Sequence, residues 1–71
     1  MSVEQLKNEI KEKLAVLNSQ TDRHDKMQIA INLKIALNTV VRYMDGEVRR
    51  LELAEQIIEE AQKVLKTKQA A

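Results

Sequence analysis

The sequence predicts an all-α protein, and three observations lead to that class. The 71-residue chain contains no proline and a single glycine, Gly46, and both residue types disrupt helix interiors. Apolar residues recur at spacings of three and four, which places them on one face of a helix, and no alternating pattern typical of strands competes. The core must be aliphatic, because Tyr43 is the only aromatic residue. A chain of this length forms one domain at most.

The first predicted helix covers residues 3–17. Its apolar stripe consists of Val3, Leu6, Ile10, Leu14 and Leu17. Ser2 is a suitable N-cap, with Gln5 three residues later to complete a capping box. The polar run over residues 18–22 then predicts a loop, because such side chains compete with helical backbone hydrogen bonds. The candidates for the N-cap of the next helix are Ser19, Thr21 and Asp22.

From residue 23 onward the pattern predicts one long helix to residue 67, followed by a frayed tail over 68–71. A seven-residue repeat runs through the segment without a change of phase, which indicates a seam that stays on one partner. Its members are Leu37, Met44, Leu51, Ile58 and Leu65. The one candidate interruption is Asp45-Gly46, a dipeptide typical of turns. We favour a continuous helix, kinked at most at Gly46, because a turn has no reason to preserve the repeat.

The predicted architecture is a helical hairpin that assembles as a dimeric four-helix or coiled-coil-like bundle. At ~1.5 Å per residue, a first helix of about 22 Å covers only part of a second helix of about 65 Å. The apolar stripe that is left uncovered predicts an interface between two copies. The residues assigned to this interface are Leu37, Val40, Met44, Val48, Leu51, Ile58 and Leu65. The alternative is a monomeric three-helix bundle with a turn at Asp45-Gly46.

Composition excludes several classes of function. Twelve Lys and Arg residues against eleven Asp and Glu leave the chain near neutral, so nothing attracts it globally to nucleic acid or to acidic membranes. The lack of cysteine excludes thiol chemistry and disulfides. No apolar run is long enough to cross a bilayer, and the N-terminus lacks the apolar segment of a signal peptide. We therefore expect a cytoplasmic protein without a membrane partner.

Candidate catalytic and metal-binding groups are sparse. One histidine, one glycine and no cysteine cannot build a phosphate-binding loop, a Cys/His pair or a Ser/His/Asp set. Asp22, His24 and Asp25 place three potential metal ligands in four residues, but the adjacent pair points apart on a helix. We interpret the two acids as residues favoured at a helix N-terminus. The sequence thus predicts no enzyme activity, no cofactor and no metal.

One apolar group is a candidate for binding a partner protein. Met27, Ile31 and Ile35 are spaced by four and lie well off the main apolar stripe. They are suited to a groove that receives a partner helix or peptide, and Tyr43 could anchor such a contact. The competing interpretation is that the first helix or a second copy covers them.

One basic group is a candidate for nucleic acid and consists of Asn38, Arg42, Arg49 and Arg50. It lacks interleaved aromatic residues for base stacking, which weakens this interpretation. The predicted function is therefore a small non-enzymatic protein–protein interaction module acting as a homo-oligomer. An adaptor, a small chaperone, an inhibitor or an assembly factor would fit. The alternative function is a small dimeric nucleic-acid-binding regulator that uses the three arginines.

Overall fold

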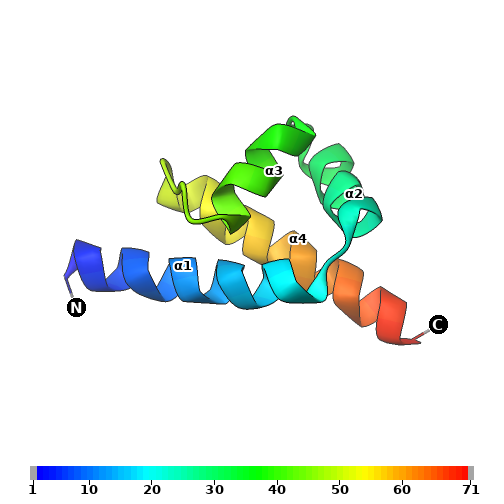
Figure 1. The fold of residues 1–71 in the computed structure, drawn as a ribbon, viewed down its shortest axis with the longest axis horizontal. Helices are drawn as coiled ribbons and strands as arrows, with labels where there is room; N and C mark the ends of the chain where they lie inside the picture. The colour runs from blue at the N-terminus through cyan, green and yellow to red at the C-terminus, as the bar shows by residue number, and fades with distance from the viewer. Residues whose placement is uncertain (1, 71) are drawn as a thin grey trace.

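A computed structural model describes residues 2–70 of the protein, with side chains as far as Lys68. These residues form four helices, which are α1 (Val3–Gln20), α2 (Arg23–Leu33), α3 (Leu37–Met44) and α4 (Leu51–Ala70). The all-α class is confirmed, although the helices number four rather than the two or three expected. Helix α4 contacts α1 and α2, and α3 contacts the same two helices (Figure 1). Within the described residues, every helix is too short or too polar to cross a membrane.

Capping side chains determine where α1 and α2 begin. The Ser2 hydroxyl accepts the Gln5 N–H at 3.2 Å and the Gln5 amide oxygen accepts the Ser2 N–H at 3.1 Å, so the predicted capping box is confirmed. Asp22 is the N-cap of α2, and its carboxylate accepts the Asp25 N–H at 2.8 Å. Asp25 returns the bond by accepting the Asp22 N–H at 3.2 Å. Each box pairs two backbone N–H groups that a helix start leaves without partners.

Helix α1 extends to Gln20, past its predicted end, and the loop predicted over residues 18–22 is correspondingly shorter. The hydroxyl of Ser19 donates to the Val16 carbonyl at 2.6 Å. The hydroxyl of Thr21 donates to the Leu17 carbonyl at 2.8 Å. The two hydroxyls therefore bond to carbonyl groups of α1, and these polar residues do not end the helix earlier.

The long helix predicted over residues 23–67 is wrong, and its first break follows α2. Lys34 adopts φ 57° and ψ 44°, which is the left-handed conformation. Its N–H donates to the Ile31 carbonyl at 3.2 Å, and the Ile35 N–H donates to the Ala30 carbonyl at 3.0 Å. This pair of bonds ends a helix when a left-handed residue follows it. Lysine is rare in that conformation, so the sequence carries no signal for a break here.

The second break follows α3 and uses the same pair of bonds. Gly46 has φ 104°, its N–H donates to the Tyr43 carbonyl at 3.1 Å, and the Glu47 N–H donates to the Arg42 carbonyl at 3.0 Å. The turn at Asp45-Gly46 considered in the three-helix alternative is thus present. The seven-residue repeat misleads because α3 and α4 each carry an apolar stripe, and the connection between them happens to preserve its phase.

A single aliphatic core joins all four helices. Two alanines of α4, Ala54 and Ala61, are fully buried, and their small side chains leave room for close packing against this helix. Val48 contributes from the connection between α3 and α4, where its side chain is also buried. One protomer therefore covers the apolar residues that a straight long helix would leave bare. The largest fully or almost fully buried side chains are Leu14, Ile29, Val40, Met44 and Ile57.

Helix α4 continues to Ala70, through residues that were predicted to form a frayed tail from residue 68 onward. The Lys68 ammonium lies 3.1 Å from the Asp25 carboxylate and 3.6 Å from that of Asp22. The last turn of α4 is therefore linked to the first turn of α2, which favours helical order at this end of the chain. Ala71 lies outside the described residues.

The replacement Gly46→Ala should lower the free energy of unfolding by about 1–2 kcal/mol, measured by urea denaturation. A Cβ at this position meets open space, so the cost comes from the positive φ alone. Asp45→Ala, at an exposed neighbour with ordinary backbone angles, is the matched control and should change stability little. If Gly46→Ala were stabilising, the chain would continue as a helix through this point.

The replacement Lys34→Gly should raise the free energy of unfolding by about 0.5–1 kcal/mol, because glycine adopts the left-handed conformation without strain. Lys34→Ala is the control for loss of the charge and should have a much smaller effect. Both variants can be compared by thermal melting followed by circular dichroism. A loss of about 1 kcal/mol with glycine would instead indicate a helix interior.

Candidate functional site

The residues predicted to form an interface between copies are mostly used inside one chain. Val40, Met44, Val48 and Ile58 are buried in its core. The other three are half-buried and pack against that core; they are Leu37, Leu51 and Leu65. The exposed stripe from which a dimer was predicted is therefore absent from the described fold, because the chain folds back over it. Dimerisation stays a prediction that needs a different surface.

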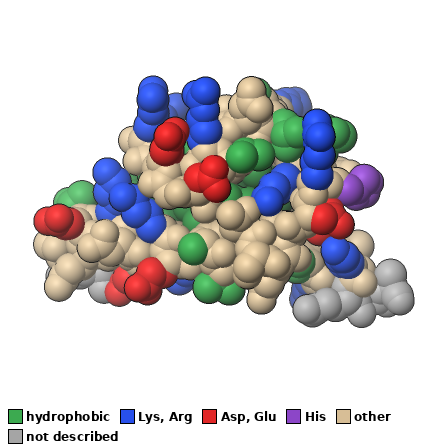
Figure 2. Space-filling model, viewed as in Figure 1, with side chains coloured by type: hydrophobic (Ala, Val, Ile, Leu, Met, Phe, Trp, Pro, Cys, Tyr) green, Lys and Arg blue, Asp and Glu red, His purple; other side chains and the backbone are tan. Residues whose placement is uncertain are grey.

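The candidate partner-binding group is divided by the fold. Met27 and Ile31 are 43% and 63% exposed on the outer face of α2. Hydrophobic side chains are visible over α2 and its connection to α3 in Figure 2. Ile35 is half-buried and packs against the core. Tyr43 is 5% exposed, and its hydroxyl accepts the N–H of Arg50 at 3.1 Å, so its ring and its polar end both have partners within the chain.

The candidate nucleic-acid residues are partly brought together. Arg42, Arg49 and Arg50 line a pocket of about 230 Å³ between α3 and the segment before α4, whereas Asn38 lies outside it. Acidic side chains stand among the basic ones: Glu47 lines the same pocket and Glu52 lies 4.0 Å from Arg50. Figure 2 shows Lys and Arg gathered with acidic groups at this end of the molecule. The local charge is therefore mixed rather than strongly positive.

Asp22, His24 and Asp25 come closer together than their spacing in the sequence suggested, with one potential metal-ligand atom from each within 4.8 Å of the others. The N-cap residue lies outside the helix, which lets its carboxylate turn toward the first turn. Both carboxylates already accept backbone N–H groups, and both face the Lys68 ammonium. That ammonium occupies the place of a counter-cation, so the geometry is that of a helix N-terminus paired with a lysine.

Two pKa shifts follow from this arrangement. The bond from the Asp25 N–H to the Asp22 carboxylate lowers the pKa of Asp22 below its ordinary value of 3.8, and the Lys68 charge lowers it further. The hydrogen bond to Asp25 raises the pKa of Lys68 above its ordinary value of 10.5. Both groups are therefore charged at neutral pH.

An open groove with an apolar floor lies between α1 and α4, and we call it the α1–α4 groove. The two helices run in the same direction, and the groove lies along their C-terminal halves (Figure 1). It encloses about 550 Å³. Leu17 and Leu65 form its floor, and Val16, which is 56% exposed, stands beside them. The remaining lining residues are polar or charged and consist of Glu9, Glu12, Lys13, Gln20, Gln62 and Lys66.

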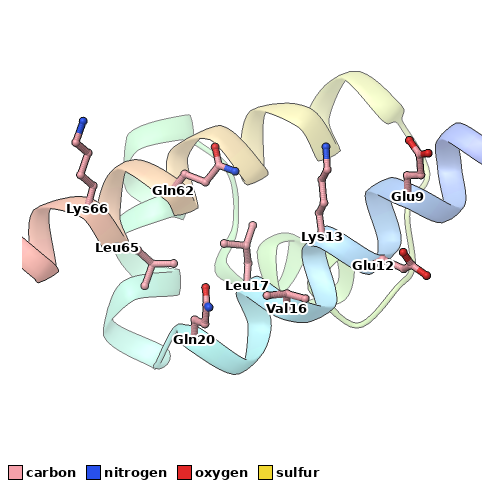
Figure 3. A pocket seen from close by; sticks show the side chains of 9 residues that line it. All are labelled: Glu9, Glu12, Lys13, Val16, Leu17, Gln20, Gln62, Leu65 and Lys66. Atoms are coloured by element: carbon pink, nitrogen blue, oxygen red, sulfur yellow. The ribbon is translucent and has the colours of Figure 1, made fainter.

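Charge along the α1–α4 groove changes from one end to the other. Figure 3 shows Glu9, Glu12 and Lys13 toward one end, which is therefore acidic by one net charge, and Lys66 at the opposite end, with Val16 and Leu17 between them. All four charged side chains are exposed. Among the ion pairs of the described residues, none involves these four groups. They are thus available to a partner that lies along the groove.

The sequence analysis did not identify this groove. Val16 is not part of the apolar stripe predicted for the first helix, because at ~100° per residue it lies about 100° from Leu17 and about 120° from Ile10. An apolar residue that far from the stripe is a signal for a second surface on the same helix. The part contributed by α4 had no such signal, because Leu65 also fits the seven-residue repeat.

No protein-family model matches the chain, and no significant match exists among curated proteins or solved structures. Function therefore has to be inferred from the surfaces of the fold itself.

Asp22 gives a prediction about stability and pH. Because its pKa is lowered in the folded state, its ionised form stabilises the fold fully above pH 3.8, and this contribution is lost as the pH falls through the lower folded value. Asp22→Asn keeps an N-cap acceptor but removes the titration. Urea unfolding between pH 6 and about pH 2 should therefore show a smaller acid-induced loss for the variant than for the parent chain. Parallel pH curves would contradict the assignment.

Proposed function

We propose that this chain is a small non-enzymatic protein–protein interaction module that receives a helix of its partner in the α1–α4 groove. The observation that carries this proposal is an apolar floor, Leu17 and Leu65, next to the largely exposed Val16. Isolated exposed apolar residues are common on protein surfaces, but an apolar strip inside a charged rim is typical of binding sites. An amphipathic helix laid along the strip would cover the apolar atoms and meet the charges at its edges.

The chemistry of the lining favours binding over catalysis. The groove residues described above include acids, lysines, glutamines and aliphatic side chains, and none of them is a histidine or a hydroxyl nucleophile. The acids stand in solvent at the groove's edge rather than in an enclosed pocket, where their pKa could be tuned for proton transfer. An adaptor, small chaperone, inhibitor or assembly factor working in the cytoplasm would use such a surface.

A second candidate function is binding to nucleic acid through Arg42, Arg49 and Arg50, which the fold gathers around one pocket. The acids beside them, Glu47 and Glu52, reduce the local positive potential, so this proposal ranks below the first. A regulator of this kind would bind duplex DNA with an affinity that falls steeply with salt.

Site-specific photo-crosslinking tests the interaction module directly. A photo-reactive phenylalanine analogue at position 16, in the groove, should give one discrete protein–protein product in an extract of the source cells. The matched control is position 3, where Val3 is 73% exposed and lies roughly 140° around α1 from Val16. Equal labelling at both positions, or no product at position 16, would contradict a binding role for the groove.

A further inference from the structure

The distribution of charge along the α1–α4 groove indicates what occupies it. We propose that the occupant is the same groove of a second copy of this chain, related by a two-fold axis so that the two grooves run antiparallel. This inference rests on the proposed function, because it names the partner of the same site. Of the residues that the seven-residue repeat had suggested, this pairing surface includes Leu65 alone.

The two ends of the α1–α4 groove carry opposite net charge. A two-fold axis that passes near Val16 reverses the groove, so the acidic end of one copy faces the basic end of the other. Glu9 and Glu12 of each copy then lie opposite Lys66 of the second copy. A parallel arrangement would instead place acids against acids and lysine against lysine. A self-complementary surface of this kind is what a two-fold interface requires.

The apolar residues of the groove lie where the two copies would meet. Val16 lies between the charged ends, beside Leu17 and Leu65 (Figure 3). Near the axis, Val16 of one copy would enter the groove of the other and cover its floor. Burial of Val16 and of the exposed part of Leu65 provides the attraction, since Leu17 is already only 6% exposed within one copy. The exposed charges contribute little free energy, about 0–1 kcal/mol per pair, and mainly determine the direction of pairing.

The surface of the chain is large enough for an interface of ordinary size. A standard interface buries about 800 Å² on each partner, which is roughly a sixth of the 5046 Å² surface of this chain. The molecule measures 39 × 23 × 17 Å, so one long face can supply that area. The other exposed apolar group, Met27 and Ile31 on α2, lies outside the residues that line the groove.

Sedimentation equilibrium of the purified chain tests the pairing. The mass should rise from 8.2 kDa toward twice that value as the concentration increases from about 10 µM to about 1 mM. Val16→Asp should weaken association by about tenfold or more, because two like charges would meet near the axis. Val3→Asp is the matched control and should leave association unchanged. Circular dichroism shows whether each variant remains folded.

Charge reversal tests the antiparallel direction. Lys66→Glu makes both ends of the groove acidic, and the double variant Glu9→Lys/Glu12→Lys makes both ends basic. Each variant should associate more weakly than the parent chain, while an equimolar mixture of the two should associate more strongly than either alone. Each variant carries charges of the same sign at both ends of its own groove. Stronger association in the mixture therefore requires contact between copies of opposite charge. If the mixture gains nothing, the antiparallel arrangement is wrong.

The remaining outcomes separate this inference from the proposed function. A parent chain that stays at 8.2 kDa at every concentration, while position 16 cross-links to a different protein, overturns the second copy but keeps the interaction module. A dimer that responds equally to Val16→Asp and Val3→Asp uses another face and also overturns the inference. A monomer with no cross-link at position 16 overturns both.

Discussion

The fold depends on two residues with left-handed backbone conformation, Lys34 and Gly46. At each of them the chain leaves a helix abruptly, and two backbone N–H groups bond back to the carbonyls of the helix that has just ended. These breaks let α3 and α4 fold back, so that α4 packs against α1 and α2. Without them, residues such as Ile57 and Ala61, which are now fully buried, would lie on a helix too long for its neighbour to cover.

Polar interactions determine how the folded-back helices are joined. Tyr43 links the end of α3 to the start of α4 through the Arg50 N–H, and Lys68 links the end of α4 to Asp25 at the start of α2. The core thus closes within one copy and uses almost every large apolar residue of α3 and α4. What remains for function is the outer surface of α1 and α2 and the face of α4 that lies beside α1. The α1–α4 groove is the part of that surface where an apolar floor and ordered charges coincide.

Much of the local structure could be predicted from the sequence. The helical class followed from the spacing of apolar residues, and the start of α1 followed from Ser2 and Gln5, whose capping box is present. The break at Lys34 could not be predicted, because lysine itself disfavours the left-handed conformation that it adopts here. The turn at Gly46 was not predicted, because the seven-residue repeat continues across it. Periodicity indicates that residues are buried, but it does not show which partner covers them.

The candidate sites were also predicted only in part, because periodicity shows that a residue is buried but not which surface covers it. Residues such as Val40 and Met44 were correctly interpreted as buried, but the surface that covers them belongs to their own chain. The groove escaped prediction because it joins α1 to α4, and no local pattern shows which distant helix will lie beside Val16. The opposite charge of the two groove ends can be recognised only in the fold, where Lys66 lies at the end opposite Glu9.

In the fold described above, the chain folds back twice and closes its core by itself. Backbone chemical shifts of the isotope-labelled protein test it most directly. Helical shifts are expected over the four helices, with interruptions over residues 34–36 and 45–50, and Lys34 and Gly46 should show the couplings and shifts of positive φ. Uninterrupted helical shifts from residue 23 to residue 67 would contradict it.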